Sequence, residues 1–417
     1  MAGNPLLPDM GVSDPHVTIH GDRAYLFAGH DPLLADWWVW SSTDLVNWKQ
    51  ESVLRPEETF IAKPFEKGCW ASFGAFKNNR CYWYFSAGAN EIGVVVADSP
   101  AGPWKDPLGK PLIPAGMVPT DERDPDILID DDEKVYMVFG TFNYYIARLD
   151  EDMISLAEKP RLVQLDRKFG PAGAGITDDK PSLHKRNGIY YLSWSSFYAM
   201  SRNLYGPYAY KGSVIVPEFL SPDFRKDDLW CDRHGNFFKW NNQWYYLCHD
   251  LHQPDGHGRA ACLSYLHFRD NGEMAPIRLD KLGVGQYDAA QGRIEAEDYF
   301  KAVGAEKAEH PIAGFEMRNL CNGTFLVYPK VMNLRQNTLI SFRVSSNNPA
   351  DGMIEVRENG PQARVLGSCR IPRDMKKWDV YRTITCTLQN EARTKDLCFA
   401  FKGSSEEMAR LDWFEFH

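Results

Sequence analysis

The chain has 417 residues, of which 44% are hydrophobic and 25% charged, and this composition excludes a largely disordered protein. Its formal net charge is −9 and it has no basic stripe, so nucleic acid and anionic membranes are poor candidates for partners. No apolar run reaches the roughly 18 residues of a membrane helix.

The first residues, MAGNPLLPDMGVSDPHV, show no basic segment followed by an apolar one, as a signal peptide would. We therefore expect a cytoplasmic protein, or a secreted or periplasmic one if a signal peptide has been removed. Nine cysteines occur without a CxxC pair or a Cys/His ligand spacing. This pattern favours free buried thiols over a zinc site.

Five segments of the chain share one pattern, a polar opening, a short apolar strand, a turn of Asn, Asp or Gly, and an aromatic-rich strand. Their starts are 54 to 56 residues apart, at Asp14, Trp70, Asp124, Asp179 and Arg233. About four strands per repeat is the size of a propeller blade. The sequence therefore predicts an all-β chain whose residues 1–285 form a five-bladed β-propeller.

The repeat openings predict where a site would lie. The innermost strand of each propeller blade lines the central channel, so the first residues of these strands converge at one mouth. Three carboxylates, a tryptophan and a histidine would then surround that mouth, from Asp14, Trp70, Asp124, Asp179 and His234. Tryptophan and tyrosine offer an apolar face and a polar edge that suit sugars.

A ring of carboxylates in an aromatic pocket suits glycoside hydrolysis. One carboxylic acid protonates the leaving oxygen, and a carboxylate on the opposite face of the sugar activates a water molecule. A third carboxylate raises the pKa of the acid by like-charge repulsion. An Asp-Pro pair is also a common turn former, but two such pairs in phase with a repeat favour a functional role.

The pattern changes after about residue 285, where GVGQYDAAQG reads as a linker. Residues 292–417 contain short strands such as TLISFRV, MIEVRE and LCFAFKG, which predict a small antiparallel, jelly-roll-like β-sandwich. Strand alternation places Glu295 and Glu297 on one face. No phosphate-binding or dinucleotide-binding glycine motif occurs, so we expect no organic cofactor.

Three segments of the predicted propeller resemble glycoside hydrolase family 43, GVSDPHV, RDPDILIDDDEKVYMVFG and DRHGNFFKWNNQWYYLCHD. The resemblance implies that Asp14 is the general base and that Asp124 tunes and orients the acid. It also implies that His234 lies at the centre of the channel, where it ligates a calcium ion or an ordered water. A plain hydrogen-bonding role in the core is the alternative for His234.

The fourth repeat departs from that family. Its segment TDDKPSLHKRNGIYYLSW has Asp179 where the family has the glutamate that acts as general acid. Either Asp179 is the acid, or Asp178 or another carboxylate such as Glu218 replaces it, or the site binds sugar with little catalysis. In the second repeat the family's Trp-Ala-Pro-Asp is Trp70-Ala71-Ser72-Phe73, which implies a reshaped subsite. The substrate-binding candidates are Trp70, Phe73, Phe142, Trp194 and His234.

The C-terminal segment resembles carbohydrate-binding module family 6 in RIEAEDY, NGTFLVY, KKWDVYRTI and RLDWFEF. The resemblance implies a structural calcium ion held by Glu295, Glu297 and Asp412, for which solvated strand-edge charges are the alternative. The sugar site of that family is matched less well, with Trp378 and Phe315 as its aromatic candidates.

The sequence therefore predicts an inverting glycoside hydrolase that removes terminal sugars from plant-derived oligosaccharides. Arabinofuranosyl and xylosyl units are expected from the resemblance, and galactosyl or galactofuranosyl units stay open. The alternative is a propeller that binds carbohydrate without efficient catalysis. The sequence does not predict the oligomeric state.

Overall fold

The computed structural model describes residues 3–8, 10–31, 34–166, 177–222, 224, 233–250, 258–373 and 377–417. Contacts divide the chain into two compact units. The first comprises Met1–Phe238, Tyr245–Leu266 and Ala275–Lys281, and the second comprises Lys239–Trp244, His267–Met274 and Leu282–His417. The domain boundaries 1–285 and 292–417 stay predictions. Among the described residues no helix is long and apolar enough to span a membrane.

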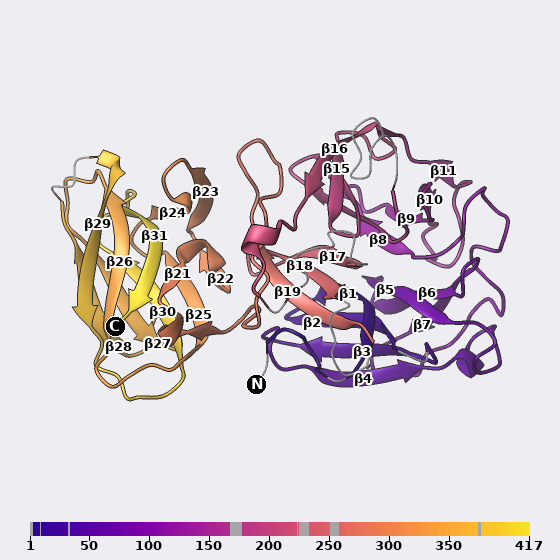
Figure 1. The fold of residues 1–417 in the computed structure, drawn as a ribbon, viewed down its shortest axis with the longest axis horizontal. Coiled ribbons are helices and arrows are strands. Elements are labelled where there is room, and N and C mark those ends of the chain that lie inside the picture. Colours follow the sequence, from indigo (N-terminus) through magenta and orange to yellow (C-terminus); the bar gives the residue numbers. More distant parts are fainter. Residues whose placement is uncertain are drawn as a thin grey trace. The chain divides into compact units, whose positions relative to one another are not determined.

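Five sheets follow one another in chain order, antiparallel except for the parallel pairing of β12 with β16, and they confirm the predicted five-bladed propeller (Figure 1). The first two sheets are β1 (Val12–His20), β2 (Arg23–His30), β3 (Trp37–Ser42), β4 (Lys49–Leu54) and then β5 (Cys69–Lys77), β6 (Arg80–Ala87), β7 (Ile92–Ala97). The third is β8 (Asp126–Ile129), β9 (Val135–Phe139), β10 (Tyr145–Arg148), β11 (Arg161–Leu162). The fourth is β13 (Pro181–Arg186), β14 (Ile189–Trp194), β15 (Phe197–Ser201), β16 (Tyr208–Ser213), with β12 (Leu165–Asp166) on its edge. The fifth is β17 (Gly235–Trp240), β18 (Gln243–Asp250), β19 (Ala260–Leu266).

The hairpins form because the turns contain residues that tolerate positive φ. Asn78 and Asn79 have φ of 52° and 58°, and Asn241 and Asn242 have 53° and 65°. Two successive positive values are those of the type I′ turn, whose twist matches the flanking strands. The strands that follow are almost entirely buried, as in VYMVF of β9, because neighbouring blades cover both of their faces.

Aromatic and aliphatic side chains fill the spaces between blades. One buried cluster joins the first two blades through Phe27, Trp37 and Trp83. The blades approach closely there, since a Cβ atom on Gly74 would lie 2.0 Å from the Phe27 ring. Similar clusters lie between the second and third blades and between the third and fourth blades.

The ring closes between the fifth and first blades. The Asn236 side chain on β17 accepts a hydrogen bond from Val17 N at 2.9 Å and donates one to Val17 O at 3.0 Å, on β1. Residues near the N-terminus lie along β19, where Leu6 N donates to Ala261 O at 2.7 Å. The Asn4 side chain bonds both backbone groups of Leu263, at 2.8 and 2.9 Å.

The second unit contains the β-sandwich, which confirms that fold prediction. One sheet has the order β20 (Tyr287–Asp288), β25 (Phe325–Met332), β30 (Lys395–Lys402), β27 (Gly352–Glu358), β28 (Val365–Ile371), with β22 (Lys301–Val303) on β25. The other has the order β23 (Glu306–His310), β24 (Gly314–Leu320), β31 (Ala409–Phe416), β26 (Leu339–Ser346), β29 (Lys377–Thr387), with β21 (Arg293–Glu295) on β31. Phe399 of one sheet packs edge-on against Phe342 and Phe414 of the other, which places the core between the sheets.

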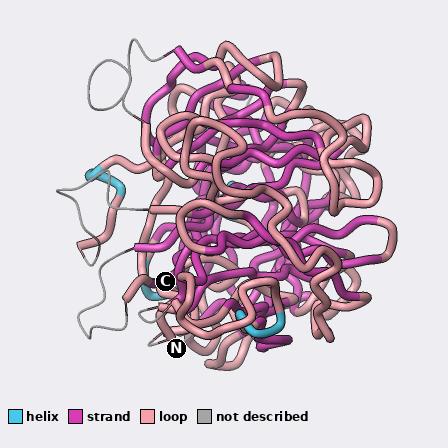
Figure 2. The backbone as a smooth tube through the Cα atoms, turned by 90° about the vertical axis from the view of Figure 1, so that its right-hand side faces the viewer, coloured by secondary structure: helices cyan, strands magenta, loops and turns pink. Residues whose placement is uncertain are grey.

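Helix occurs in the described residues only as short 3₁₀ turns, visible as the small cyan segments in Figure 2. They are η1 (Pro56–Glu58), η3 (Pro217–Phe219), η4 (Ala289–Gln291) and η5 (Ala296–Asp298). The eight described cysteines are free thiols, as predicted, and Cys231 lies outside the described residues.

Candidate active site

Unusual backbone conformation marks the inner end of three blades. Asp14, Asp124 and Lys180 each precede a proline and have φ of 47°, 58° and 64°. Residues other than glycine rarely adopt this left-handed backbone conformation, and residues strained in this way are frequent at functional sites. In the fourth blade the residue in this position is therefore Lys180, and Asp179 stands one residue before it.

Asp14 is a buried carboxylate held by cationic and imidazole donors. Its Oδ1 accepts from Arg259 Nη1 at 2.9 Å and lies 3.0 Å from His234 Nδ1. Burial alone would raise the pKa of Asp14, but the Arg259 charge and the His234 hydrogen bond together hold that pKa well below its usual value. No hydrogen bond from a described residue reaches Oδ2, so an ionised oxygen is available to a water molecule.

Two histidines fix the orientation of Asp14. His249 Nδ1 accepts the backbone N–H of Asp14 at 3.0 Å, so the proton of the neutral ring is on Nε2. Burial lowers the pKa of both His234 and His249. Both rings are therefore neutral at pH 7, and His234 donates from Nδ1 to the carboxylate.

Asp124 has the opposite electrostatic character. Its Oδ2 accepts the backbone N–H of Lys180 at 3.1 Å, and its own N–H donates to Ser86 Oγ at 2.8 Å. Burial raises the pKa of Asp124 well above its usual value, and the charges of Asp179 and Asp14 raise it further. The site therefore contains two buried carboxyls whose pKa values are shifted in opposite directions.

Asp179 is partly exposed and lies between two cations. Its Oδ2 is 3.4 Å from Arg123 Nη2, and its Oδ1 is 3.4 Å from Lys180 Nζ. Arg123 Nε also lies 3.8 Å from Asp124 Oδ2. The structure thus brings Asp14, Asp124 and Asp179 into one connected cluster, as the repeat phase predicts, and adds cations that sequence reasoning missed.

The alternative acids are placed differently. Asp178 is half-buried, and burial followed by the Asp179 charge raises its pKa. Its backbone carbonyl accepts the Tyr144 hydroxyl at 2.7 Å, which anchors this segment to the third blade. Glu218 is exposed in η3, and no contact places it near the carboxylate cluster. Asp179 and Asp178 therefore remain the candidates for the acid among the described residues.

The aromatic candidates divide into mouth and core positions. Trp70 is half-buried at the mouth, but the guanidinium of Arg123 covers one ring face, 5.0 Å from its centroid. Phe142 is 54% exposed beside Asp178, whose carbonyl accepts the Phe142 N–H. Trp194 is buried between the third and fourth blades. Phe73 is buried at the axis with its ring 5.1 Å from that of His16.

The channel axis next to the cluster contains buried polar atoms with no hydrogen-bond partner among the described residues: His16 Nε2, Asp126 Oδ2 and His234 Nε2. The first two lie 3.7 Å apart. Burial lowers the pKa of His16 to about 3 and raises that of Asp126 to about 7. Calcium takes six to eight oxygen ligands. These atoms therefore suit an ordered water, or a hydrated cation that keeps most of its waters.

The acidic residues of the sandwich are engaged by arginines. Asp412 pairs with Arg343, and Arg293 Nε lies 3.0 Å from Glu295 Oε1. Burial, together with the charges of Asp298 and Glu295, raises the pKa of Glu297 well above its usual value. Among the described residues no group of three or more acidic, histidine or cysteine side chains is arranged to hold a metal. Glu297 Oε2 and Asp412 Oδ1 are buried without a hydrogen-bond partner among the described residues, and the calcium site of these three residues stays a prediction.

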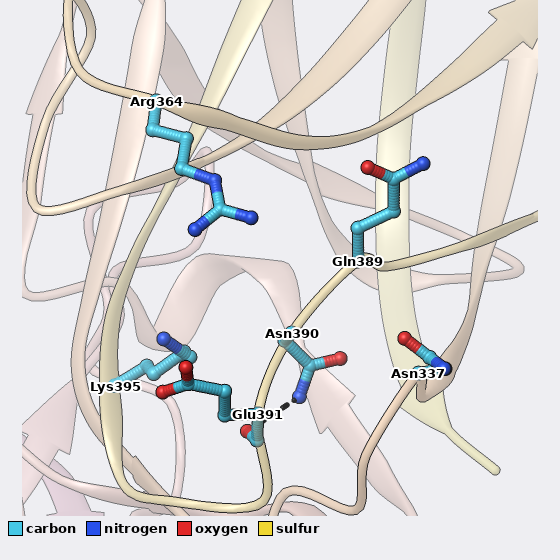
Figure 3. Close-up of a pocket in the computed structure, with 6 residues that line it drawn as sticks. All are labelled: Asn337, Arg364, Gln389, Asn390, Glu391 and Lys395. Atoms are coloured by element: carbon cyan, nitrogen blue, oxygen red, sulfur yellow. Dashed lines mark hydrogen bonds between the residues drawn. The ribbon is translucent and has the colours of Figure 1, made fainter.

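The predicted sugar platforms of the sandwich are also covered. The Arg410 guanidinium lies 4.5 Å from the Trp378 ring centroid, and Phe315 packs against His267. At the sandwich end where three strand connections meet, a pocket of about 210 Å³ is lined by Asn337, Arg364, Gln389, Asn390, Glu391 and Lys395 (Figure 3). This lining has no aromatic ring for a sugar to stack on.

Sequence reasoning missed Arg259, Arg123, Lys180 and His249 as site residues. Arg259 forms ion pairs with Asp14 and Asp31 and so joins the fifth blade to the first. Arg123 directly precedes Asp124 and Lys180 directly follows Asp179 in the sequence, so both could have been predicted to lie near the site. Arg259 and His249 lie outside the phase of the repeat openings, and no spacing rule identifies them.

Comparisons with known proteins identify the families of both parts of the chain. The family model for glycosyl hydrolases family 43 matches residues 2–274, and that for carbohydrate binding module family 6 matches residues 295–417. An arabinoxylan arabinofuranohydrolase of Paenibacillus polymyxa is 25% identical over 99% of this chain and 74% of its own length. A xylosidase/arabinosidase of Bacteroides ovatus is 26% identical over 60% of this chain and 89% of its own length.

Solved structures show the same fold. The arabinoxylan arabinofuranohydrolase of Bacillus subtilis in complex with cellotetraose has a TM-score of 0.57 at 21% identity, covering 99% of this chain and 97% of its own. A family 43 enzyme of Xanthomonas citri complexed with xylose has a TM-score of 0.54 at 25% identity, covering 66% of this chain and 92% of its own. Both resemblances drawn from the sequence motifs are confirmed.

Proposed function

Because the chain belongs to glycosyl hydrolases family 43 and carries a C-terminal carbohydrate-binding module of family 6, we propose that it is an inverting glycosidase acting on plant-derived oligosaccharides. It releases terminal arabinofuranosyl or xylosyl units, the sugars in the names of its relatives. The observation that carries this proposal is the meeting of three carboxyls from three blades, with Asp14 held by Arg259 and His234 and with Asp124 and Asp179 both contacted by Arg123.

In the proposed reaction Asp14 takes a proton from a water molecule, whose oxygen attacks the anomeric carbon. Asp14 suits this role because Arg259 and His234 hold Oδ1 and leave Oδ2 for the water. Asp179 gives its proton to the glycosidic oxygen as that bond breaks. Attack from the face opposite the leaving group inverts the anomeric centre.

Asp124 lies beside Asp179 and is proposed to orient it. Lys180, which follows Asp179 in the chain, donates its backbone N–H to Asp124 Oδ2 at 3.1 Å. Arg123 contacts both carboxyls, with Nη2 3.4 Å from Asp179 Oδ2 and Nε 3.8 Å from Asp124 Oδ2. The proposed acid thus works within a cluster of nearly balanced charge.

One observation favours the second candidate, carbohydrate binding with little catalysis. Asp179 forms ion pairs with Arg123 and Lys180, so both of its carboxyl oxygens are already engaged by cations, and it is one methylene shorter than the glutamate usual at this position. Under this alternative the propeller holds a terminal sugar at the mouth without cleaving it. Good leaving groups need no protonation, so the two candidates differ most with natural substrates.

The test is hydrolysis of 4-nitrophenyl α-L-arabinofuranoside, β-D-xyloside, β-D-galactoside and β-D-galactofuranoside. We expect turnover of one of the first two, and its loss in Asp14→Asn. Asp179→Asn should impair cleavage of a methyl glycoside of that sugar much more than of the nitrophenyl glycoside. Full activity of Asp14→Asn would reject the mechanism. Calorimetric binding of oligosaccharide without turnover would favour the second candidate.

For the channel axis we propose a hydrated calcium ion at His234, as the resemblance to the family implies, with Asp126 as a second ligand because its Oδ2, like His234 Nε2, is buried without a hydrogen-bond partner among the described residues. When bound, the ion would supply positive potential near the buried carboxylates. Metal analysis of the purified protein, and activity after dialysis against a chelator, would test this. A metal-free protein of full activity would leave an ordered water in that role.

A further inference from the structure

Arg123 connects three blades of the propeller at the carboxylate cluster. Its guanidinium lies over Trp70 of the second blade, 5.0 Å from the ring centroid. Its Nη2 is 3.4 Å from Asp179 Oδ2 of the fourth blade, and its Nε is 3.8 Å from Asp124 Oδ2 of the third. Only 16% of the side chain is exposed. No other described arginine touches both Asp124 and Asp179.

The guanidinium is fixed before any substrate binds. Arg123 Nε donates to Thr141 Oγ1 at 2.9 Å. Thr141 is buried and is itself held by Thr120, which accepts the Thr141 N–H at 3.1 Å and donates to its carbonyl at 2.7 Å. The Arg123 carbonyl accepts the Gly140 N–H at 3.0 Å. A planar guanidinium in such a frame offers donors in fixed directions.

We propose that Arg123 is a positioning residue that holds the shortened proton donor, Asp179, in its working place. This proposal rests on the proposed function. Aspartate is one methylene shorter than the glutamate usual at this position, so its carboxyl needs a fixed partner to stay in place. Lys180 is a weaker candidate because its flexible ammonium carries no preset direction.

Other charged groups lie around Arg123 and Asp179 and remain in place when Arg123 is substituted. Asp121 lies 3.6 Å from Arg123 Nη2 on the same segment. Asp178 and Lys180 flank Asp179 in the chain, and the Asp179 charge acts on His234 and on Tyr144. Of these groups only Lys180, besides Arg123, forms an ion pair with the Asp179 carboxylate, so substitution of Arg123 should displace Asp179.

The experiment compares Arg123→Met and Arg123→Lys with the wild-type enzyme on two glycosides of the sugar it cleaves, the 4-nitrophenyl and the methyl glycoside. A misplaced catalytic group costs about 100-fold. We expect Arg123→Met to lower kcat on the methyl glycoside by about 100-fold and on the nitrophenyl glycoside by less than about threefold. KM should change little, and Arg123→Lys should recover part of the loss.

Arg161→Met is the matched control. The Arg161 guanidinium stacks on the Tyr205 ring, 3.6 Å from its centroid, and makes no contact with the carboxylate cluster among the described residues. This variant should leave both rates unchanged. Thr141→Val removes the bond that orients Arg123 and should give a weaker form of the same substrate dependence, which keeps the test valid if Arg123→Met fails to fold. Equal losses on both glycosides, or a rise in KM alone, would overturn the positioning role. Activity retained in Asp14→Asn would instead reject the proposed function.

Discussion

Asp14 and Asp124 are both buried, yet their surroundings shift their pKa values in opposite directions. Arg259 and His234 outweigh burial and lower the pKa of Asp14. Asp124 receives one backbone N–H from Lys180, and burial with the charges of Asp179 and Asp14 raises its pKa. Two residues of the same type thus obtain different acidities from different partners, as pairs of titratable groups with separate roles require.

Asparagine should therefore have opposite effects at the two positions. Asp124→Asn preserves an oxygen for the Lys180 N–H and removes a group that costs stability when ionised. A raised folded-state pKa means that wild-type stability falls as pH rises above the unfolded-state pKa, so this variant should gain stability relative to the wild type as the pH rises above about 4. Thermal unfolding across that range measures it, and a constant difference would contradict the assignment.

Asp14→Asn should destabilise the protein by about 1–3 kcal/mol at pH 7, because Arg259 and His234 lose a charged acceptor. The variant should still fold, since Arg259 keeps its pair with Asp31. Because the pKa of Asp14 is lower in the folded than in the unfolded protein, its carboxylate stabilises the fold at pH values above the unfolded-state pKa, and this stabilisation is lost as the pH falls. The deficit should therefore shrink below about pH 4. A deficit independent of pH would argue that Asp14 is neutral in the folded protein.

At this scale the sequence predicted the carboxylates and His234 but missed their charged partners. Asp14 and Asp124 were identifiable because each opens a repeat. The open or covered state of an aromatic face was not predictable, because it depends on one long side chain. Trp70 and Trp378 both read as platforms, and in the structure Arg123 and Arg410 lie on them.

The element that closes the propeller is the segment at residues 4–6. The Asn4 amide imitates a strand residue by bonding both Leu263 N and Leu263 O, and it also donates to Asp280 O at 2.7 Å. Substitution by alanine would leave backbone groups of β19 without these partners. Blade spacing predicted the five sheets, whereas this closure depends on a short polar segment that no periodicity marks.

We expect Asn4→Ala to lower the free energy of unfolding by about 1–3 kcal/mol, the usual cost of leaving buried hydrogen-bonding groups unpaired. Asn47→Ala is the matched control, because the Asn47 side chain makes an exposed bond to Asp44 and its loss should cost less than about 0.5 kcal/mol. Urea unfolding of both variants measures the difference. Equal effects would show that Asn4 contributes no more than a surface residue.

For the molecule as a whole, buried histidines link stability to acidity. His184 stacks on Tyr191 inside the fourth blade, and burial followed by the Arg186 charge lowers its pKa to about 3. The unfolded chain binds this proton below about pH 6.5, and the folded protein binds it only near pH 3. The neutral His184 therefore makes its full contribution to the free energy of unfolding above pH 6.5, and this contribution is lost as the pH falls toward 3.

His184→Phe removes this titration. Relative to the wild type, its unfolding free energy should improve by up to about 1.4 kcal/mol for each pH unit between 6 and 4. Phe237→Leu, which alters a neighbouring ring 5.0 Å away, should shift stability by an amount that does not depend on pH. Denaturant unfolding at three pH values distinguishes them. Parallel curves for His184→Phe and the wild type would contradict the neutral buried histidine.

The closing contact of the propeller also has a consequence in time. Asn4 is separated from its partner Leu263 by 259 residues. At a synthesis rate of about 5–20 residues per second, a ribosome adds Leu263 roughly 13 to 52 seconds after it adds Asn4. During that interval β19 does not yet exist, so residues 4–6 of the nascent chain have no native strand to pair with and are exposed to pairing with the edges of other strands. Ribosomal pausing before residue 263 would lengthen this exposure and slow the appearance of the finished ring.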